Sequence, residues 1–223
     1  MINPMLNADN CILRDEYYNS EFEKILGKII TCYKCMIENN ERLDDNENFI
    51  RDRMLYGYLK KQWFKVRYEV TNYLFDSELP EINLPEAKGR IDIRVMPVNP
   101  LVNDDAYYII ECKRLNSENI NGSTGLNSEY INEGLFRFVS TKYSTYYKTN
   151  GMIGFVVHSL DIHNNVHSIN QLLNSFSQAN TIQNLQIRNI VQDFDCCYLS
   201  THSIADKEIT LYHLMLDFSS NIN

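Results

Sequence analysis

Two short segments, each with a strand-like apolar pattern and each carrying an acidic side chain, constrain the fold of this chain most strongly. Residues 89–95 (Gly-Arg-Ile-Asp-Ile-Arg-Val) alternate between polar and apolar side chains, with Asp92 at their centre. Residues 106–110 (Ala-Tyr-Tyr-Ile-Ile) form an apolar run that ends in Glu111-Cys112-Lys113. Both patterns are typical of β-strands. We therefore expect two carboxylates and a lysine at the ends of two adjacent strands.

The tripeptide Glu-x-Lys carries little information without this context. The chain contains a second copy, Glu86-Ala87-Lys88, which follows Pro85 in a predicted turn and has no apolar strand before it. Residues 111–113, by contrast, end a hydrophobic strand that comes after a strand with an aspartate. On pattern alone, a surface salt bridge at a strand end, with an unrelated Asp92 nearby, stays open as an alternative.

The remaining periodicity predicts one α/β domain over residues 1–223. Apolar residues at helical spacing predict helices at 21–40, 46–63, 128–147 and 166–179, with Asn46 as a helix cap, Phe49 facing inward and Tyr143 on the apolar face of its helix. Strands are expected at 66–75, 89–95, 107–112, 152–158, 195–201 and 209–218. The order of the core is helix, three strands, helix, strand (α-β-β-β-α-β), preceded by an N-terminal helix and followed by a helix and strands. This order predicts a mixed central β-sheet flanked by helices.

The charge of the chain is unevenly distributed. The formal net charge of the 223 residues is −8, which argues against strong unaided binding to duplex DNA. Residues 88–150 hold 8 basic and 7 acidic side chains, against 11 and 16 before them and 2 and 6 after them. The segment with Asp92 and Glu111 is therefore the least acidic part, although a solvated acidic surface elsewhere explains the pattern equally well.

Composition also points to a compartment. No signal peptide is visible at the start of the sequence, and no apolar run approaches the roughly 18 residues that a membrane span needs. Six cysteines without a secretory signal indicate reduced thiols. We expect a cytoplasmic protein with no membrane partner.

The acidic pair and the lysine fit the chemistry of phosphodiester hydrolysis. Mg²⁺ or Mn²⁺, bound by oxygen ligands, can neutralise the phosphate and activate water. Asp92, Glu111 and the carbonyl oxygen of Cys112 are the candidate metal ligands. Lys113 lies on the same strand face as Glu111, opposite Cys112. Lys113 would orient or deprotonate the attacking water, or stabilise charge on the phosphorane; as a base it would need a lowered pKa.

With these residues the chain resembles the PD-(D/E)XK nuclease superfamily, which has the restriction-endonuclease-like fold. Gly89-Arg-Ile-Asp-Ile93 and Tyr107-Tyr-Ile-Ile-Glu-Cys-Lys113 carry the resemblance, which covers about residues 46–158. It implies divalent-metal cleavage of DNA or, less often, RNA, with Asp92 and Glu111 as metal ligands and Lys113 as the catalytic lysine. Ile91 stands where many members have proline. Many members also carry an acidic residue on the first core helix, and Glu47 is the candidate here; its alternative role is an interaction with the helix dipole.

Residues 129–143, followed by residues 151–156, resemble a subset of that family from bacterial defence systems. In the predicted helix, Arg137 would contact phosphate, or instead form a salt bridge to Glu133 four residues earlier. Gly134 would allow close packing of the helix on the sheet. Lys142 faces solvent or contacts a DNA backbone.

Two further clusters have competing interpretations. Basic side chains interleave with aromatic ones between residues 51 and 67, either as a surface that follows a nucleic-acid backbone or as the solvent face of an amphipathic helix. The basic residues are Arg51, Arg53, Lys60, Lys61, Lys65 and Arg67. A zinc site at His163 and His167, with Cys196 or Cys197, is the weaker alternative to surface histidines and core cysteines.

The sequence thus predicts a metal-dependent endonuclease that cleaves DNA in bacterial defence against phage or foreign DNA. The alternatives are a catalytically inactive nucleic-acid- or protein-binding subunit with the same fold, and an RNase. The short acidic chain leads us to expect a partner ATPase or sensor protein. Cleavage of both strands would favour a homodimer, with the C-terminal strands as one possible interface.

Overall fold

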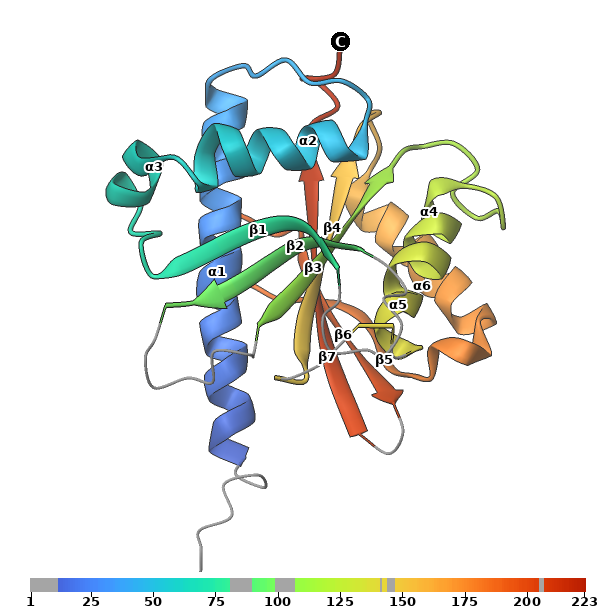
Figure 1. Cartoon of the computed structure of the whole chain (residues 1–223). Coiled ribbons are helices and arrows are strands. Elements are labelled where there is room, and N and C mark those ends of the chain that lie inside the picture. The colour runs from blue at the N-terminus through green and yellow to red at the C-terminus, as the bar shows by residue number, and fades with distance from the viewer. Residues whose placement is uncertain (1–11, 81–89, 99–106, 141, 144–146, 205–206) are drawn as a thin grey trace, which may run out of the picture.

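In the computed structural model, a single twisted sheet runs through the molecule and helices cover both of its faces (Figure 1). The structure describes residues 12–80, 90–98, 107–140, 142–143, 147–204 and 207–223. The tripeptide Glu86–Lys88 lies outside the described residues, as does Gly89. The predicted mixed α/β fold with a helix-flanked central sheet is confirmed.

The sheet has seven strands in the order β1-β2-β3-β4-β7-β6-β5. β1, β2 and β3 form an antiparallel meander, β4 pairs parallel with β3 and with β7, and β6 and β5 continue antiparallel. Buried β3 and β4 occupy the middle, as expected of strands that are covered on both faces. The strands are β1 (Tyr73–Pro80), β2 (Arg90–Pro97), β3 (Tyr108–Leu115), β4 (Thr149–Val156), β5 (Thr181–Ile187), β6 (Cys197–Ile204) and β7 (Lys207–Asp217).

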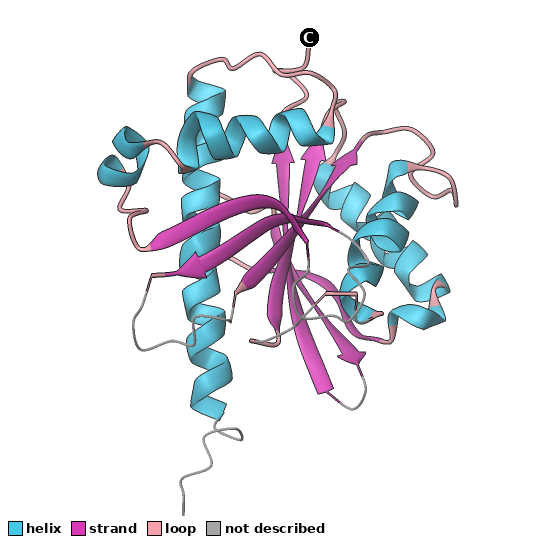
Figure 2. Cartoon of the chain, viewed as in Figure 1, coloured by secondary structure: helices cyan, strands magenta, loops and turns pink. Residues whose placement is uncertain are grey.

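Alternate strand residues supply two hydrophobic cores, one on each face of the sheet. The first core packs under the long helix α1 (Ile12–Glu38) and under α2 (Glu47–Met54), η2 (Leu55–Leu59) and α3 (Gln62–Arg67). The second packs under α4 (Leu126–Glu129), η3 (Tyr130–Leu135), α5 (Phe136–Val139), α6 (Ile162–Ser175) and η4 (Ser177–Ala179). Figure 2 shows α1 and the α4–α6 group on opposite sides of the strands. Among the described residues, no helix is both long and apolar enough to cross a membrane.

The helix predicted over 46–63 is present but interrupted. Asn46 caps α2 as predicted, since its side chain accepts a hydrogen bond from the backbone N–H of Phe49 at 3.0 Å. The π-helical turn η2 follows, and the chain then breaks at Lys60 and Lys61 before α3. The prediction that Phe49 faces inward is wrong, because its side chain is exposed.

The strand predicted over 66–75 is wrong in its first half. Residues 66 and 67 end α3, where the rings of Phe64 and Tyr68 contact each other one helical turn apart in a tilted arrangement, with centroids 4.6 Å from each other. Glu69 adopts a positive φ of 56° and turns the chain. β1 begins at Tyr73 and reaches Pro80, which an edge strand tolerates. The contact between Phe64 and Tyr68, four residues apart, stabilises a helical turn in a segment whose local pattern predicted a strand.

The other boundaries differ by a few residues, with three larger departures, of which the first is that α1 starts at Ile12, nine residues before the predicted start. The helix predicted over 128–147 ends at Val139 and contains the π-helical segment η3. α6 starts earlier than expected, at Ile162, because Asp161 caps it. β5 was not predicted, since its polar sequence Thr-Ile-Gln-Asn-Leu-Gln-Ile gives a weak strand signal and its pairing with β6 is irregular. The chain end returns to the loop before α2, where Leu43 pairs with Ile222 (Figure 1).

Candidate active site

The predicted acidic pair meets where β2 and β3 stop pairing through their backbones. Pairing covers residues 93–95 of β2 and 108–110 of β3. At the next position, the Asp92 carboxylate takes the place of a backbone acceptor: its Oδ2 accepts a hydrogen bond from the Cys112 N–H at 2.8 Å. Asp92 is thereby fixed beside the end of the apolar run of β3, next to Glu111.

The Glu111 carboxylate is enclosed by cations and by a hydroxyl group. It is 0 % exposed, with Lys113 Nζ 3.0 Å and Arg137 Nη1 3.1 Å from its Oε1, while the Tyr143 hydroxyl donates to its Oε2 at 2.7 Å. Neither cation reaches Oε1 with good hydrogen-bond geometry, and no other group in the described part of the chain does so. Burial and the neighbouring charge of Asp92 raise the pKa of Glu111 to about 7, against the opposing effect of both cations.

The Lys113 ammonium lies at the point where the candidate ligands converge. Its Nζ is 2.9 Å from the carbonyl oxygen of Cys112, 3.0 Å from Glu111 Oε1 and 3.2 Å from Glu47 Oε1. Burial favours the neutral amine, but the carboxylates of Glu111, Glu47 and Asp92 outweigh it and raise the pKa of Lys113. These carboxylates therefore favour the ammonium form of Lys113, whereas a lysine base would need a lowered pKa.

The first residue of α2 joins the site, as the sequence predicted for Glu47. Asn46 caps the helix, which leaves the Glu47 carboxylate to contact Lys113. Burial is the main reason that the pKa of Glu47 is raised; Asp92 adds to it and Lys113 opposes it. A cavity of about 330 Å³ opens beside Glu47 and Lys113, and its lining includes Arg114 and Glu133. A solvent-borne ligand therefore reaches this side of the site.

Arg51 is a site residue that the sequence did not reveal, and its expected place in a basic surface cluster is wrong. Its side chain is 2 % exposed, with Nη1 3.5 Å from Asp92 Oδ1 and Nη2 3.0 Å from Glu78 Oε1. Its Nε also donates to Asp52 Oδ1 at 3.0 Å. Arg51 follows Glu47 by four residues, so both lie on one face of α2. That spacing is the signal that would have assigned Arg51 to the site.

The rest of the predicted basic cluster is partly neutralised. Arg53 pairs with Glu41 at 2.6 Å, and Lys60 Nζ is 3.6 Å from Asp76. The rings of Tyr56 and Trp63 are exposed beside them. These ion pairs favour the interpretation that the basic residues form the solvent-exposed face of short helices.

Arg137 does not form the salt bridge that helical spacing suggested. It contacts Glu111, and its Nη1 donates to the Tyr143 hydroxyl at 2.7 Å, so the predicted bridge to Glu133 is wrong. Tyr143 was expected as a core residue of the helix; it is buried beyond the helix end and is hydrogen-bonded to Glu111. Lys142, next to it, is exposed.

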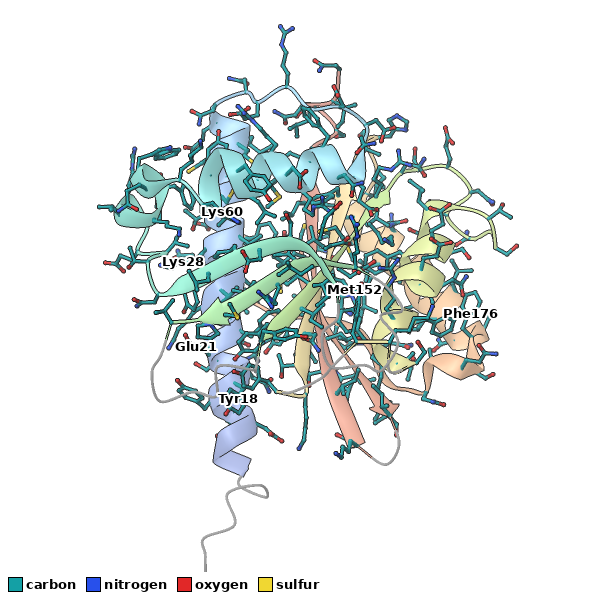
Figure 3. All side chains as sticks on the ribbon, in the orientation of Figure 1. Tyr18, Glu21, Lys28, Lys60, Met152 and Phe176 are labelled. Carbon is teal, nitrogen blue, oxygen red and sulfur yellow. The ribbon has the colours of Figure 1, made fainter. Side chains whose placement is uncertain are left out.

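Gly134 packs directly on the site, as predicted. A Cβ atom at this position would clash with the Cε of Met152 and would lie 3.4 Å from the Cγ of Lys113. Figure 3 labels Met152 near the middle of the molecule, beside the α4–α5 helices. The glycine thus lets η3 approach β3 and β4 closely enough for Arg137, one turn later, to reach Glu111. π-Helical segments occur frequently at functional sites.

Comparisons of the chain with protein-family models, with curated proteins and with solved structures gave no match. The chemistry of the cluster therefore rests on its own geometry. The predicted position at the strand ends is wrong, because Asp92 and Glu111 lie within β2 and β3. The carboxylates of Glu47 and Glu111 and one backbone carbonyl contact a single ammonium, and the Asp92 carboxylate lies nearby. Such oxygen-rich surroundings attract a hard cation.

Proposed function

We propose that this chain is a divalent-metal-dependent phosphodiesterase that cleaves DNA. The observation that carries the proposal is the convergence of Glu47, Glu111 and the Cys112 carbonyl on the Lys113 ammonium, with Asp92 beside them. The element order supports a restriction-endonuclease-like core: α2, the antiparallel strands β1–β3, the α4–α5 helices, and β4 parallel to β3.

The residues present fit Mg²⁺ or Mn²⁺. Glu111 Oε1 is a buried carboxylate oxygen that forms ion pairs with Lys113 and Arg137 but receives no hydrogen bond of good geometry from the described residues, so its bonding capacity is not used up. Asp92, Glu111 and the carbonyl of Cys112 are the oxygens that would hold the ion, and Glu47 is the fourth candidate. When bound, the metal would supply charge neutralisation at the phosphate and an activated water.

The chain's own cations have separate roles in this proposal. Lys113, as an ammonium, holds the attacking water or stabilises negative charge on the phosphorus oxygens. Arg51 orients Asp92, while Arg137 and Tyr143 orient Glu111. Because Arg137 is engaged with Glu111, its predicted contact with phosphate requires that it exchange partners. Exposed Lys142 stays the candidate for contact with the DNA backbone.

One observation favours the second candidate function, a non-catalytic binding subunit with this fold. The Glu111 carboxylate is fully buried and already faces two cations, so the site is closed by internal charge pairing. A subunit of this kind would keep the contacts for stability and would not bind metal. An RNase would need the same groups as a DNase, so RNA stays a possible substrate.

We also infer a role in bacterial defence with a partner ATPase or sensor. The net charge of −8 supports the partner, because a surface this acidic is poorly suited to capture DNA unaided. The C-terminal strands support a homodimer interface: β5 is an edge strand, it bears no charged residue, and Ile182 and Ile187 are exposed on it. A cytoplasmic location follows from these roles.

The test is incubation of the purified protein with supercoiled plasmid and Mg²⁺ or Mn²⁺. We expect nicking or cleavage that Asp92→Asn and Glu111→Gln abolish, while Glu208→Gln, an exposed substitution at the start of β7, preserves it. Calorimetric titration with Mn²⁺ separates the candidates. Cleavage that the Asp92 variant retains would refute the proposed site. Binding that Glu111→Gln removes, without cleavage, would indicate a partner-activated enzyme, and absent binding would favour the non-catalytic subunit.

A further inference from the structure

A second group of side chains that can bind a metal lies outside the candidate active site, at the start of α6 and just before β6. His163, Asp195 and Cys196 bring one nitrogen, one oxygen and one sulfur donor within 4.8 Å of one another. His163 Nε2 is 3.4 Å from Asp195 Oδ2, and the Cys196 thiol donates to Asp195 Oδ1 at 3.4 Å. The cluster shares no residue with the candidate active site.

Its membership corrects the pair that helical spacing suggested. His167, four residues after His163, lies beside the side chain of Gln171 at 3.1 Å and is outside the cluster. Cys197 belongs to the buried core on the α1 face of the sheet. The partner that the sequence pattern could not supply is Asp195, which reaches His163 across the interface between α6 and the segment that enters β6.

The His163 ring is held in the orientation that metal binding needs. The Tyr198 hydroxyl lies 2.6 Å from His163 Nδ1, so the other ring nitrogen, Nε2, points toward Asp195. Metal-binding histidines usually make such a hydrogen bond through the nitrogen that does not bind the metal, because it fixes the tautomer and the ring orientation. Tyr198 is mostly buried on β6, which makes it a firm support for the exposed ring.

The Cys196 thiol is expected to be protonated at neutral pH in the metal-free protein. Burial, together with the hydrogen bond to Asp195, raises the pKa of the Cys196 thiol to about 12. Thiolate is the form that binds metal, so binding must break the S–H bond, form a metal–sulfur bond and pass the proton to the buffer.

We propose that His163, Asp195 and Cys196 form a site for Zn²⁺ with a fourth coordination position left open. Imidazole, thiolate and carboxylate are the three ligand types that Zn²⁺ uses in proteins, whereas sulfur disfavours Mg²⁺ and Ca²⁺. Zinc bonds of about 2.0–2.3 Å require donor atoms to be within roughly 4 Å of each other, so the cluster needs small side-chain adjustments. His163 and Asp195 are exposed and free to make them.

A hollow of about 650 Å³, lined by residues 189–195, adjoins the site at Asp195, so small molecules from solvent can approach it. Water, or a small anionic ligand, occupies the open coordination position in the proposal. The bound ion would join the N-terminus of α6 to the segment before β6, which are separated in the sequence by α6, η4 and β5. Zinc would then stabilise the folded chain by an amount that grows with the logarithm of its free concentration above the dissociation constant.

Titration of the reduced, metal-free protein with Co²⁺, followed by absorbance, tests the site. We expect one thiolate-to-cobalt charge-transfer band in the near ultraviolet that saturates at one equivalent and that Zn²⁺ bleaches. Cys196→Ser should abolish the band. His163→Ala and Asp195→Asn should weaken binding at least tenfold, and Tyr198→Phe should weaken it less. His167→Ala is the matched control on the same helix and should leave the titration unchanged.

Two further measurements keep the outcome decisive. Zn²⁺ should raise the thermal midpoint of the wild type and of Glu111→Gln, but not that of Cys196→Ser, which separates this site from the proposed Mg²⁺ site. Circular dichroism checks that each variant folds; should Cys196→Ser fail to do so, the Asp195→Asn and His163→Ala titrations decide. Absence of the band in the wild type, or its persistence in Cys196→Ser, would overturn the proposal.

Discussion

Lys113 Nζ lies 3.0 Å from Glu111 Oε1, so an internal cation already neutralises the buried carboxylate of the candidate site. The same ammonium contacts Glu47 and the carbonyl of Cys112. A divalent ion in this site would bind the same oxygens that Lys113 contacts. Lys113 is therefore expected to act both as a group that assists the reaction and as a competitor for the metal.

The first prediction separates these two roles of Lys113. Lys113→Met removes the competing positive charge while it keeps the apolar stem, so Mn²⁺ should bind at least tenfold more tightly, a gain of about 1.4 kcal/mol. Cleavage should nevertheless be lost. Calorimetric titration and the plasmid assay measure the two effects, with Lys142→Met as the exposed control. Weaker Mn²⁺ binding in Lys113→Met would show that the lysine supports the metal site instead of competing with it.

The second prediction concerns the contact between η3 and the sheet. Gly134→Ala inserts a Cβ against Met152 and Lys113, so we expect a loss of about 1–3 kcal/mol in the free energy of unfolding. Cleavage should fall further than stability alone explains, because the displaced helix carries Arg137. The control is Gly57→Ala, in the other π-helical segment, where the new atom meets the flexible Arg53 side chain at 3.4 Å and should change stability little. Equal effects of both substitutions on chemical denaturation would contradict this account.

The sequence predicted the part of the fold that depends on local pattern. Alternation located β2, the apolar run located β3, and Asn46 located the start of the helix that carries Glu47, although only the family resemblance pointed to Glu47 as a site residue. These features follow from a few neighbouring residues. The predicted mixed sheet between helices agrees with the structure for the same reason.

What the sequence could not predict depends on contacts between distant segments. Arg51 looked like a surface cation until packing of α2 brought it to Asp92 and Glu78, which are 41 and 27 residues away along the chain. Tyr143 was expected to be a core residue of a helix, but the helix ends at Val139 and the tyrosine turns to Glu111. β5 has almost no local strand signal and exists because β6 offers it an edge.

The third prediction tests the assignment of Arg51. Arg51→Leu should destabilise the protein by about 2–4 kcal/mol, because removing a buried partner leaves Asp92 and its neighbours without their cation. Mn²⁺ binding should weaken as well, since the Asp92 carboxylate loses one of the two contacts that orient it. Arg53→Leu, two residues later on the exposed face of the same helix, should cost less than about 1 kcal/mol. Similar costs for the two variants in urea denaturation would place Arg51 outside the site.

The fourth prediction uses a buried hydrogen-bonded chain between the α4–α5 helices and β6. The Tyr130 hydroxyl and His213 Nδ1 are 2.8 Å apart, Ser200 bridges His213 and His202, and His202 Nδ1 meets the carbonyl of Ala179. Burial lowers the pKa of His202 to about 4 and that of His213 to about 3. The nearby His202 also contributes to the lowered pKa of His213. Both rings are therefore neutral in the folded protein at neutral pH.

The sign of the resulting pH dependence follows from proton uptake on unfolding. An unfolded histidine has a pKa of about 6.5, so below that pH the unfolded chain binds more protons than the folded one. The stabilising contribution of His213 is complete above pH 6.5 and is lost toward pH 3, by at most about 1.4 kcal/mol per pH unit. His213→Gln lacks this titration. The unfolding free energy of the variant should lie below that of the wild type at pH 8, and the gap should narrow as the pH falls to 5. The comparison cancels the contributions of other groups, Glu111 among them. His167→Gln, which changes an exposed ring, should give a gap that does not vary with pH; a constant gap for His213→Gln would show that its ring is not held neutral by the fold.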